Sequence, residues 1–253
     1  VLHCRSYLPT YISLKKRTYD QKVIFDMRSL LPEENITLNK WSLGSPIYKK
    51  WKNIEYFNLK NSNHIITVSE PMKVQISNTY NYKKISNIHL IGTKKNVKID
   101  KNLREKVRNN YKISNKFVIL YVGTLDKKIL NNVNNYAKFA NKLINQFRDL
   151  YFIFSVPKIK KYFYDVFKTN NVPQDNFMFI EGITDELYYA ADAGINVMSK
   201  SLDSHTRFGI KISEYLSYGL PIIIKNVGGA EEFVKKYNLG IICNKDDYFE
   251  KFK

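Results

Sequence analysis

The chain has 253 residues, a hydrophobic share of 44%, an aromatic share of 14% and a formal net charge of +18. This length accommodates two domains of ordinary size, and the apolar content excludes an intrinsically disordered chain. The longest apolar runs, such as Phe117–Val122 and Leu150–Val156, are far shorter than the roughly 18–20 residues that a membrane span needs.

The positive charge is concentrated in the first half of the chain. Residues 1–116 hold 23 Lys and Arg against 8 Asp and Glu, whereas residues 117–253 hold 18 against 15. A basic first half implies an anionic partner there, such as membrane phospholipid, a lipid diphosphate or nucleic acid. Recognition signals for a specific nucleic acid are absent from the sequence.

One predicted helix in this half places Lys49, Lys50 and Lys52 beside Tyr48 and Trp51. Lysines are attracted to anionic lipid and aromatic rings suit the headgroup boundary. We therefore expect this helix to dock on an anionic membrane surface. A solvated lysine-rich face is the alternative.

Cysteine and histidine do not form a metal motif. Cys4 and Cys243 lie near opposite ends, which is typical of a protein from a reduced, cytoplasmic compartment. The four histidines are scattered along the chain, and no Asp-x-Asp pair occurs. We expect no metal and no other cofactor.

In chain order, the first half alternates apolar strands with helices. The predicted strands are residues 1–4, 22–26, 64–68 and 85–91. Residues 27–44 are expected to form a loop. Ser45 and Ser69 are predicted N-caps of the two helices that follow, and Pro46 suits a first helical position. Residues 100–111 form a charged helix that is expected to connect two domains, with the boundary near residue 97.

The second half follows the same alternation at shorter intervals. Strands are predicted at 117–122, 150–156, 177–180, 194–198, 221–224 and 240–243, and helices at 132–147, 159–167, 186–191 and 230–237. Fully apolar strands between amphipathic helices indicate a parallel sheet covered on both faces. The fold class is therefore α/β, with a Rossmann-like second domain.

The most informative segment is SLDSHTRFGIKISEYLSYGLP, residues 201–221. A loop of small and polar residues leads to Phe208-Gly209, which opens a short amphipathic helix. The first N–H groups of a helix have no intrahelical partners and attract anions, phosphate above all. Glu214, about one and a half turns further in, could accept hydrogen bonds from sugar hydroxyls. The alternative is a core helix followed by a buried strand.

This segment resembles the donor-binding signature of GT-B glycosyltransferases, in particular family 4. The resemblance rests on Phe208-Gly209, Lys211, Glu214-Tyr215-Leu216 and Gly219-Leu220-Pro221, and extends to residues 23–34, 51–72 and 89–97. It implies two Rossmann-like domains, the N-terminal one incomplete. Residues 1–96 would be the remainder of the acceptor-side domain. Residues 97–253 would be the nucleotide-sugar-binding domain without its final helices, in a chain cut at both ends.

Two of the departures from the family pattern concern the expected donor site. Thr206 stands where the family often has a first glutamate, with seven residues between it and Glu214, and Arg207 could meet a diphosphate instead. Thr124 stands where the family usually has an arginine after a glycine, here Gly123.

The resemblance also implies site residues on both domains. The donor would be bound by Gly123, Ile183, Phe208, Gly209 and Glu214, with Lys127, Lys128 and Arg207 as candidates for the diphosphate. On the other domain, His3, Arg5 and Arg28 follow predicted strands and are candidate catalytic residues. Alternatives are solvated loop lysines and a structural Asp26–Arg28 ion pair.

The resulting expectation is a hexosyltransferase-type enzyme that moves a sugar from a nucleotide-diphosphate sugar to a glycan or lipid-linked acceptor. The resemblance implies metal independence, retention of anomeric configuration, a role in cell-envelope polysaccharide biosynthesis, and a cytoplasmic location at the inner face of the membrane. A sugar-nucleotide epimerase of the same shape and a degenerate homologue are the alternatives. As a fragment, the chain alone is expected to be inactive.

Overall fold

The computed structural model describes residues 1–88, 97, 100–127 and 132–243. Contacts divide the chain into two compact units. The first contains Val1–Leu90, Lys200–Phe208 and Val227–Ala230, and the second contains Ile91–Ser199, Gly209–Asn226 and Glu231–Lys253. Of residues 89–99 the structure describes only residue 97, so the boundary expected there stays a prediction.

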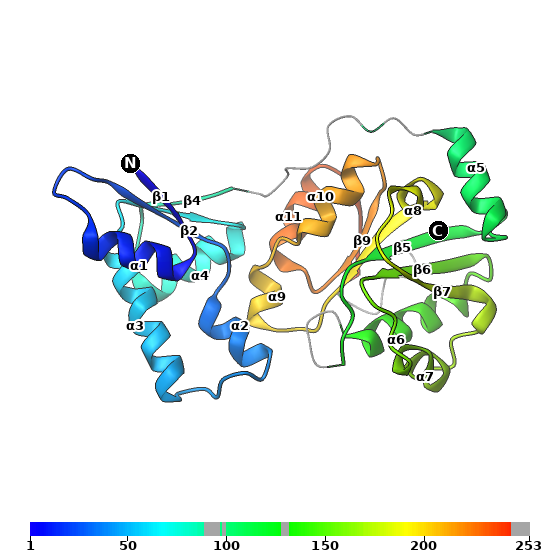
Figure 1. Ribbon diagram of the computed structural model, residues 1–253, viewed down its shortest axis with the longest axis horizontal. Helices are drawn as coiled ribbons and strands as arrows, with labels where there is room; N and C mark the ends of the chain where they lie inside the picture. The colour runs from blue at the N-terminus through cyan, green and yellow to red at the C-terminus, as the bar shows by residue number, and fades with distance from the viewer. Residues whose placement is uncertain (89–96, 98–99, 128–131, 244–253) are drawn as a thin grey trace. The chain divides into compact units, whose positions relative to one another are not determined.

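The first unit is a parallel four-stranded sheet with helices against it (Figure 1). Its strands, in the order β1-β2-β3-β4, are β1 (Leu2–Arg5), β2 (Val23–Met27), β3 (His64–Thr67) and β4 (Ile85–Asn87). Its helices are α1 (Tyr7–Lys16), α2 (Leu31–Thr37), α3 (Pro46–Asn61), α4 (Glu70–Tyr80) and α9 (Leu202–Thr206). The core joins Phe25, Met27 and Ile65 of the strands to side chains of α1, α3 and α4.

Local sequence explains how two of these helices begin. The Ser45 side chain accepts a hydrogen bond from Tyr48 N at 3.4 Å, and Ser69 Oγ accepts one from Met72 N at 3.2 Å. Both predicted caps are confirmed. Helices α1 and α2 were not predicted, because Pro9 interrupts the pattern in α1, and α2 has no side-chain cap.

A buried polar network ties the helices of the first unit together. The Glu55 carboxylate, fully buried, accepts hydrogen bonds from Tyr7 and Tyr80, both at 2.5 Å, and pairs with Lys52. Lys52 also contacts Glu33 on α2 at 3.1 Å. Burial, followed by the adjacent Glu55 carboxylate, raises the pKa of the Tyr7 hydroxyl. Helices α1, α3 and α4 therefore meet at the Glu55 carboxylate, and Lys52 extends the network to α2.

The second unit is a parallel six-stranded sheet in the order β10-β9-β8-β5-β6-β7. These strands are β5 (Phe117–Val122), β6 (Leu150–Val156), β7 (Phe177–Glu181), β8 (Ala193–Val197), β9 (Ile222–Lys225) and β10 (Gly240–Ile242). The helical elements are α5 (Lys101–Asn110), α6 (Val133–Ile144), α7 (Tyr162–Thr169), the 3-10 turn Gln174–Asn176, α8 (Asp185–Ala190), α10 (Ile210–Ser217) and α11 (Gly228–Lys236), whose first turn belongs to the first unit. The chain adds β6 and β7 on one side of β5 and then β8, β9 and β10 on the other side. The direction of strand addition therefore reverses between β5 and β8, which is the switch point of the sheet.

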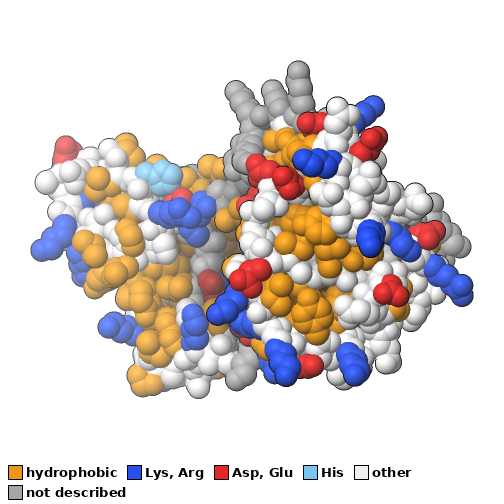
Figure 2. Space-filling model, turned by 45° about the vertical axis from the view of Figure 1, so that its right-hand side comes forward, with side chains coloured by type: hydrophobic (Ala, Val, Ile, Leu, Met, Phe, Trp, Pro, Cys, Tyr) orange, Lys and Arg blue, Asp and Glu red, His pale blue; other side chains and the backbone are white. Residues whose placement is uncertain are grey.

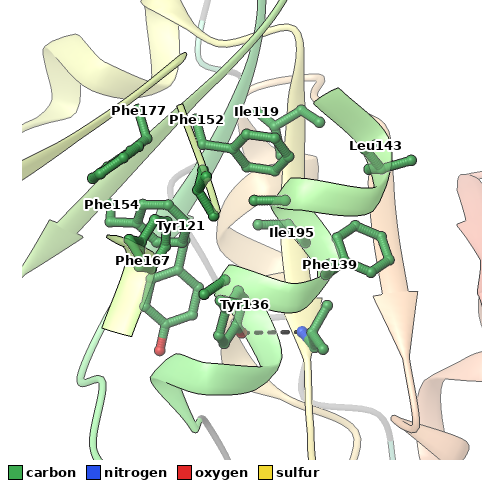
Figure 3. Close-up of a cluster of buried hydrophobic side chains, with 14 of the residues drawn as sticks. Ile119, Tyr121, Tyr136, Phe139, Leu143, Phe152, Phe154, Phe167, Phe177 and Ile195 are labelled. Carbon is green, nitrogen blue, oxygen red and sulfur yellow. Dashed lines mark hydrogen bonds between the residues drawn. The ribbon is translucent and has the colours of Figure 1, made fainter. Parts of the chain in front are cut away.

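Aromatic rings fill one face of this sheet (Figure 3). The Phe154 ring lies 5.1 Å from Phe167 and 5.9 Å from Tyr136. The Tyr136 hydroxyl accepts a hydrogen bond from Val197 N at 3.0 Å, so its one polar atom is satisfied inside the core. Side chains of α6 and α7 pack against those of the strands in this layer, as their helical periodicity predicts.

Candidate functional site

The second unit places a helix at its switch point, where ligands bind in open parallel sheets. Tyr215 of α10 is fully buried. Its hydroxyl accepts from Val122 N at 3.0 Å and donates to Ile195 O at 3.3 Å, bridging β5 and β8. Gly194 makes room for the ring, because a Cβ there would collide with Tyr215. The sequence thus anchors α10 at the carboxyl edge of the sheet.

The start of α10 lies against the loop that follows β5. Gly209 precedes the helix with φ of 86°, a left-handed conformation that glycine adopts at no steric cost. Lys211 crosses Gly123, where an added Cβ would be 2.6 Å from Lys211 Cε and 3.2 Å from its Nζ. The ammonium also lies 5.2 Å from the Tyr121 ring centre. A side chain at 123 would displace the end of Lys211, so glycine at this position allows a cation to lie against the end of β5.

Glu214 is held on the same helix. It is half-buried, and the Tyr188 hydroxyl donates to its Oε2 at 3.3 Å. Burial and then the charge of Glu214 raise the pKa of Tyr188, so this hydroxyl stays a donor at neutral pH. The contact fixes the direction of a carboxylate that the sequence assigned to the donor.

The remaining donor candidates of this unit are spread over two loops. Ile183 follows β7 and Gly182 and is 54% exposed, which leaves its side chain accessible. Lys127 is exposed and lies 4.4 Å from the ring centre of Tyr162 on α7, so its described contact is with an aromatic ring. Lys128 lies outside the described residues.

In the first unit, the structure brings together His3, Asp26 and Arg28. His3 Nε2 and Arg28 Nη1 lie 3.3 Å and 3.5 Å from the same oxygen, Asp26 Oδ2. Parallel pairing places Arg5, which is exposed, beside Asp26. The Asp26–Arg28 pair that sequence analysis left as an alternative is thus present.

Arg207 is enclosed by carboxylates of the first unit. Its Nε lies 2.9 Å from Asp203 Oδ2 and its Nη2 lies 2.7 Å from Glu34 Oε1. Burial raises the pKa of Asp203, an effect that Arg207 opposes. The guanidinium that sequence analysis offered to a diphosphate therefore has two carboxylate partners.

The segment around Arg207 is a helix and not the loop that was expected. Helix α9 begins with a capping box in which Ser201 and Ser204 bond each other's backbone N–H groups. Thr206 is 2% exposed, and its hydroxyl bonds only carbonyl oxygens of α9, those of Leu202 and Asp203. Its own carbonyl accepts from Ser69 Oγ at 2.6 Å. Phe208 is also buried.

Sequence analysis quoted Lys211 as part of a motif without giving it a role. Its role depends on Gly123, a residue distant in sequence, and on the position of α10. Within the described residues, no group of three His, Cys, Asp or Glu side chains is placed to hold a metal ion. Among the helices of these residues, none is long and apolar enough to cross a membrane.

A scan of protein-family models matches residues 103–250 to the family described as glycosyl transferases group 1. The chain belongs to this family. A search of curated proteins finds no match.

Solved structures show the same fold at low identity. HepE from Anabaena in complex with UDP has 13% identity and a TM-score of 0.70, over 97% of this chain and 65% of that one. WaaG, a glycosyltransferase involved in lipopolysaccharide biosynthesis, has 16% identity and a TM-score of 0.64, over 97% and 70%. Sucrose-phosphate synthase from Thermosynechococcus elongatus has 15% identity and a TM-score of 0.66, over 97% of this chain and 60% of the synthase chain.

These likenesses confirm the predicted fold class. The two parallel sheets are Rossmann-like sheets of a GT-B glycosyltransferase fold. The chain spans 65% of the length of the HepE chain and 60% of the synthase.

Proposed function

We propose that this protein is a glycosyltransferase that moves a sugar from a nucleotide-diphosphate sugar to a glycan or lipid-linked acceptor. The observation that carries the proposal is the arrangement at the switch point of the second unit: the N-terminus of α10, with Lys211 over Gly123 and Glu214 one turn further on. Membership of the glycosyl transferases group 1 family supports it, and HepE was solved with UDP and with UDP-glucose.

In this proposal the switch point stabilises the leaving group. The bond between the anomeric carbon and the diphosphate oxygen breaks, and the diphosphate leaves with the electron pair. The acceptor hydroxyl oxygen bonds to the carbon and gives its proton to the departing diphosphate. Backbone N–H groups at the start of α10 and the Lys211 ammonium both favour the developing negative charge. Lys211 supplies a cation next to Thr124, where the family usually has an arginine.

The remaining residues divide between the donor and the acceptor. Glu214, oriented by Tyr188, accepts hydrogen bonds from the ribose hydroxyls, and the exposed Ile183 side chain contacts the base. His3, Arg5 and Arg28 are the proposed polar groups of the first unit for the transferred sugar and its acceptor, with His3 and Arg28 oriented by Asp26. The reaction is proposed to proceed without a metal and with retention, in the synthesis of a cell-envelope polysaccharide at the cytoplasmic side of the membrane.

Nucleotide binding tests the proposal. Isothermal titration with UDP, GDP and ADP should identify a nucleotide that binds. Lys211→Met should raise the dissociation constant of that nucleoside diphosphate by about tenfold or more, because charge-assisted hydrogen bonds contribute roughly 1.5–3 kcal/mol. It should not change binding of the corresponding nucleoside. Glu214→Gln should weaken both the diphosphate and the nucleoside.

Two exposed residues of α11 provide matched controls. Lys235→Met and Glu232→Gln make the same chemical changes away from the switch point and should leave affinity unchanged. Wild-type affinity in both Lys211→Met and Glu214→Gln would overturn the assignment of the site.

A further inference from the structure

Helices α1 and α3 of the first unit form an exposed groove of about 720 Å³. Leu8, Tyr11, Ile54 and Phe57 line it together with Lys49 and Lys50. The rings of Tyr11 and Phe57 lie 5.2 Å apart and join the two helices. We call this groove and the exposed residues of α1 and α3 beside it the α1/α3 face.

The α1/α3 face exposes large aliphatic side chains. Leu8 and Ile12 are each 51% exposed, and Ile47 at the start of α3 is 45% exposed. Leu8 and Ile12 are four residues apart in α1 and therefore project on the same side of the helix. Figure 2 shows hydrophobic side chains of the first unit gathered next to Lys and Arg side chains. Apolar side chains grouped in this way mark interaction sites.

The charge of the α1/α3 face has one sign. Lys15, Lys16, Lys49 and Lys50 are exposed. Helix α1 contains no acidic residue, and the one acidic residue of α3, Glu55, is fully buried. Lys15 Nζ lies 4.6 Å from the centre of the Phe57 ring, so its charged end borders the groove.

The structure also corrects which residues of α3 are available. Lys52 is paired with Glu33 and Glu55, and Tyr48 donates to Glu33 at 3.2 Å. Trp51 packs against the core and stacks on Trp41 at 6.2 Å. These three residues, which the sequence assigned to a docking helix, belong to the interior side. Lys49 and Lys50 remain on the exposed side and are joined by residues of α1.

We propose that the α1/α3 face docks on an anionic phospholipid bilayer. Its lysines lie among the lipid phosphates, while Leu8, Ile12 and Ile47 enter the headgroup boundary. Lysine side chains bury their methylene stems and keep the ammonium in the polar layer, which suits a face that mixes the two residue types. Phosphate alone would use the lysines but not the aliphatic side chains, and nucleic acid has the same limitation. The combination matches the bilayer surface.

Vesicle co-sedimentation of the full chain, without any sugar donor, tests this inference. Vesicles of phosphatidylcholine alone are compared with equal parts of phosphatidylcholine and phosphatidylglycerol. The wild type should bind only the anionic vesicles, and less at higher salt. The triple variant Lys15→Glu, Lys49→Glu, Lys50→Glu should bind about a hundredfold more weakly or worse, given the usual contribution of each lysine near such a surface.

A matched control makes the same charge change elsewhere in the first unit. Lys22, Lys83 and Lys84 are exposed outside the α1/α3 face, and their replacement by Glu should have a much smaller effect. Equal losses in the two triple variants would reduce the effect to net charge and overturn the inference.

The aliphatic contribution has its own test. Leu8→Ser with Ile12→Ser retains every charge and should lower vesicle binding by about tenfold, because two large apolar side chains no longer leave water. Unchanged binding would contradict insertion, as would displacement of the wild type by inorganic phosphate beyond that caused by sodium chloride at the same ionic strength. Because no donor is present, these outcomes are independent of the proposed transferase activity.

Discussion

The cores of the two units of this protein are stabilised by different kinds of interaction. The first unit ties four helices to one buried carboxylate, that of Glu55, through two tyrosines and a lysine. The second unit packs phenylalanines and tyrosines, and Tyr136 satisfies its hydroxyl with a single backbone N–H. A polar network fails when one partner is lost, whereas an aromatic layer loses stability in proportion to what is removed.

The strongest way to break this comparison is Glu55→Ala. Removing the carboxylate leaves Lys52 as a partly buried charge without this partner, and the Tyr7 and Tyr80 hydroxyls both lose the carboxylate acceptor. The free energy of unfolding should fall by about 3–5 kcal/mol. The sequence contains two tryptophans, Trp41 and Trp51, both in the first unit, so denaturant titration followed by tryptophan fluorescence reports on this unit.

An exposed ion pair of the same unit is the control for Glu55. Glu70 pairs with Lys73 at 2.9 Å on the surface of α4, and Glu70→Ala should cost about 0–1 kcal/mol. A loss at Glu55 no larger than at Glu70 would mean that the network does not hold the helices together.

A smaller effect is expected from Tyr136→Phe in the second unit. The ring and its packing are retained, but Val197 N–H loses its acceptor in a buried position, at a cost of roughly 1–3 kcal/mol. The change should shift unfolding measured by far-UV circular dichroism more than the tryptophan signal. Tyr164→Phe, on a ring that is 39% exposed, is the control. Equal shifts for Tyr136→Phe and Tyr164→Phe would mean that the Tyr136 hydroxyl does not contribute to the stability of this core.

The smallest effect is expected at Thr206. Its hydroxyl bonds only carbonyls of its own helix, so Thr206→Ala should cost less than about 1 kcal/mol in stability and leave kcat/KM nearly unchanged in the enzyme. A loss of activity like that of Glu214→Gln would give Thr206 or its neighbour Arg207 a chemical role. Transfer kinetics with the nucleotide sugar identified above would measure it.

Much of the fold could be predicted because apolar strands and amphipathic helices have distinct periods. The strands at 117–122 and 150–156 agree with the structure residue for residue. Helix α9 was not predicted because four of its five residues are polar and its capping box uses Ser204 in place of an acidic residue. Helix α2 offered no side-chain cap at all.

The site was less predictable, because its contacts join residues far apart in sequence. The position of Glu214 followed from the helix signature, and its contact with Tyr188 did not. Arg207 and Glu34 are far apart in sequence, and neither local sequence predicts that they form an ion pair. Similarly, the approach of Lys211 to Gly123 depends on the anchoring of Tyr215 between β5 and β8.

The first unit is discontinuous, and this has a consequence for synthesis on the ribosome. Its sheet and the helices α1 to α4 are complete in sequence by Leu90, but Lys200–Phe208, which contains α9, and Val227–Ala230 also belong to it. At roughly 5–20 residues per second, these segments emerge on the order of ten seconds later. During that interval Glu34 lacks its ion pair with Arg207, and Ser69 lacks its hydrogen bond to the Thr206 carbonyl. The first unit therefore reaches its native state only after most of the second unit has been translated.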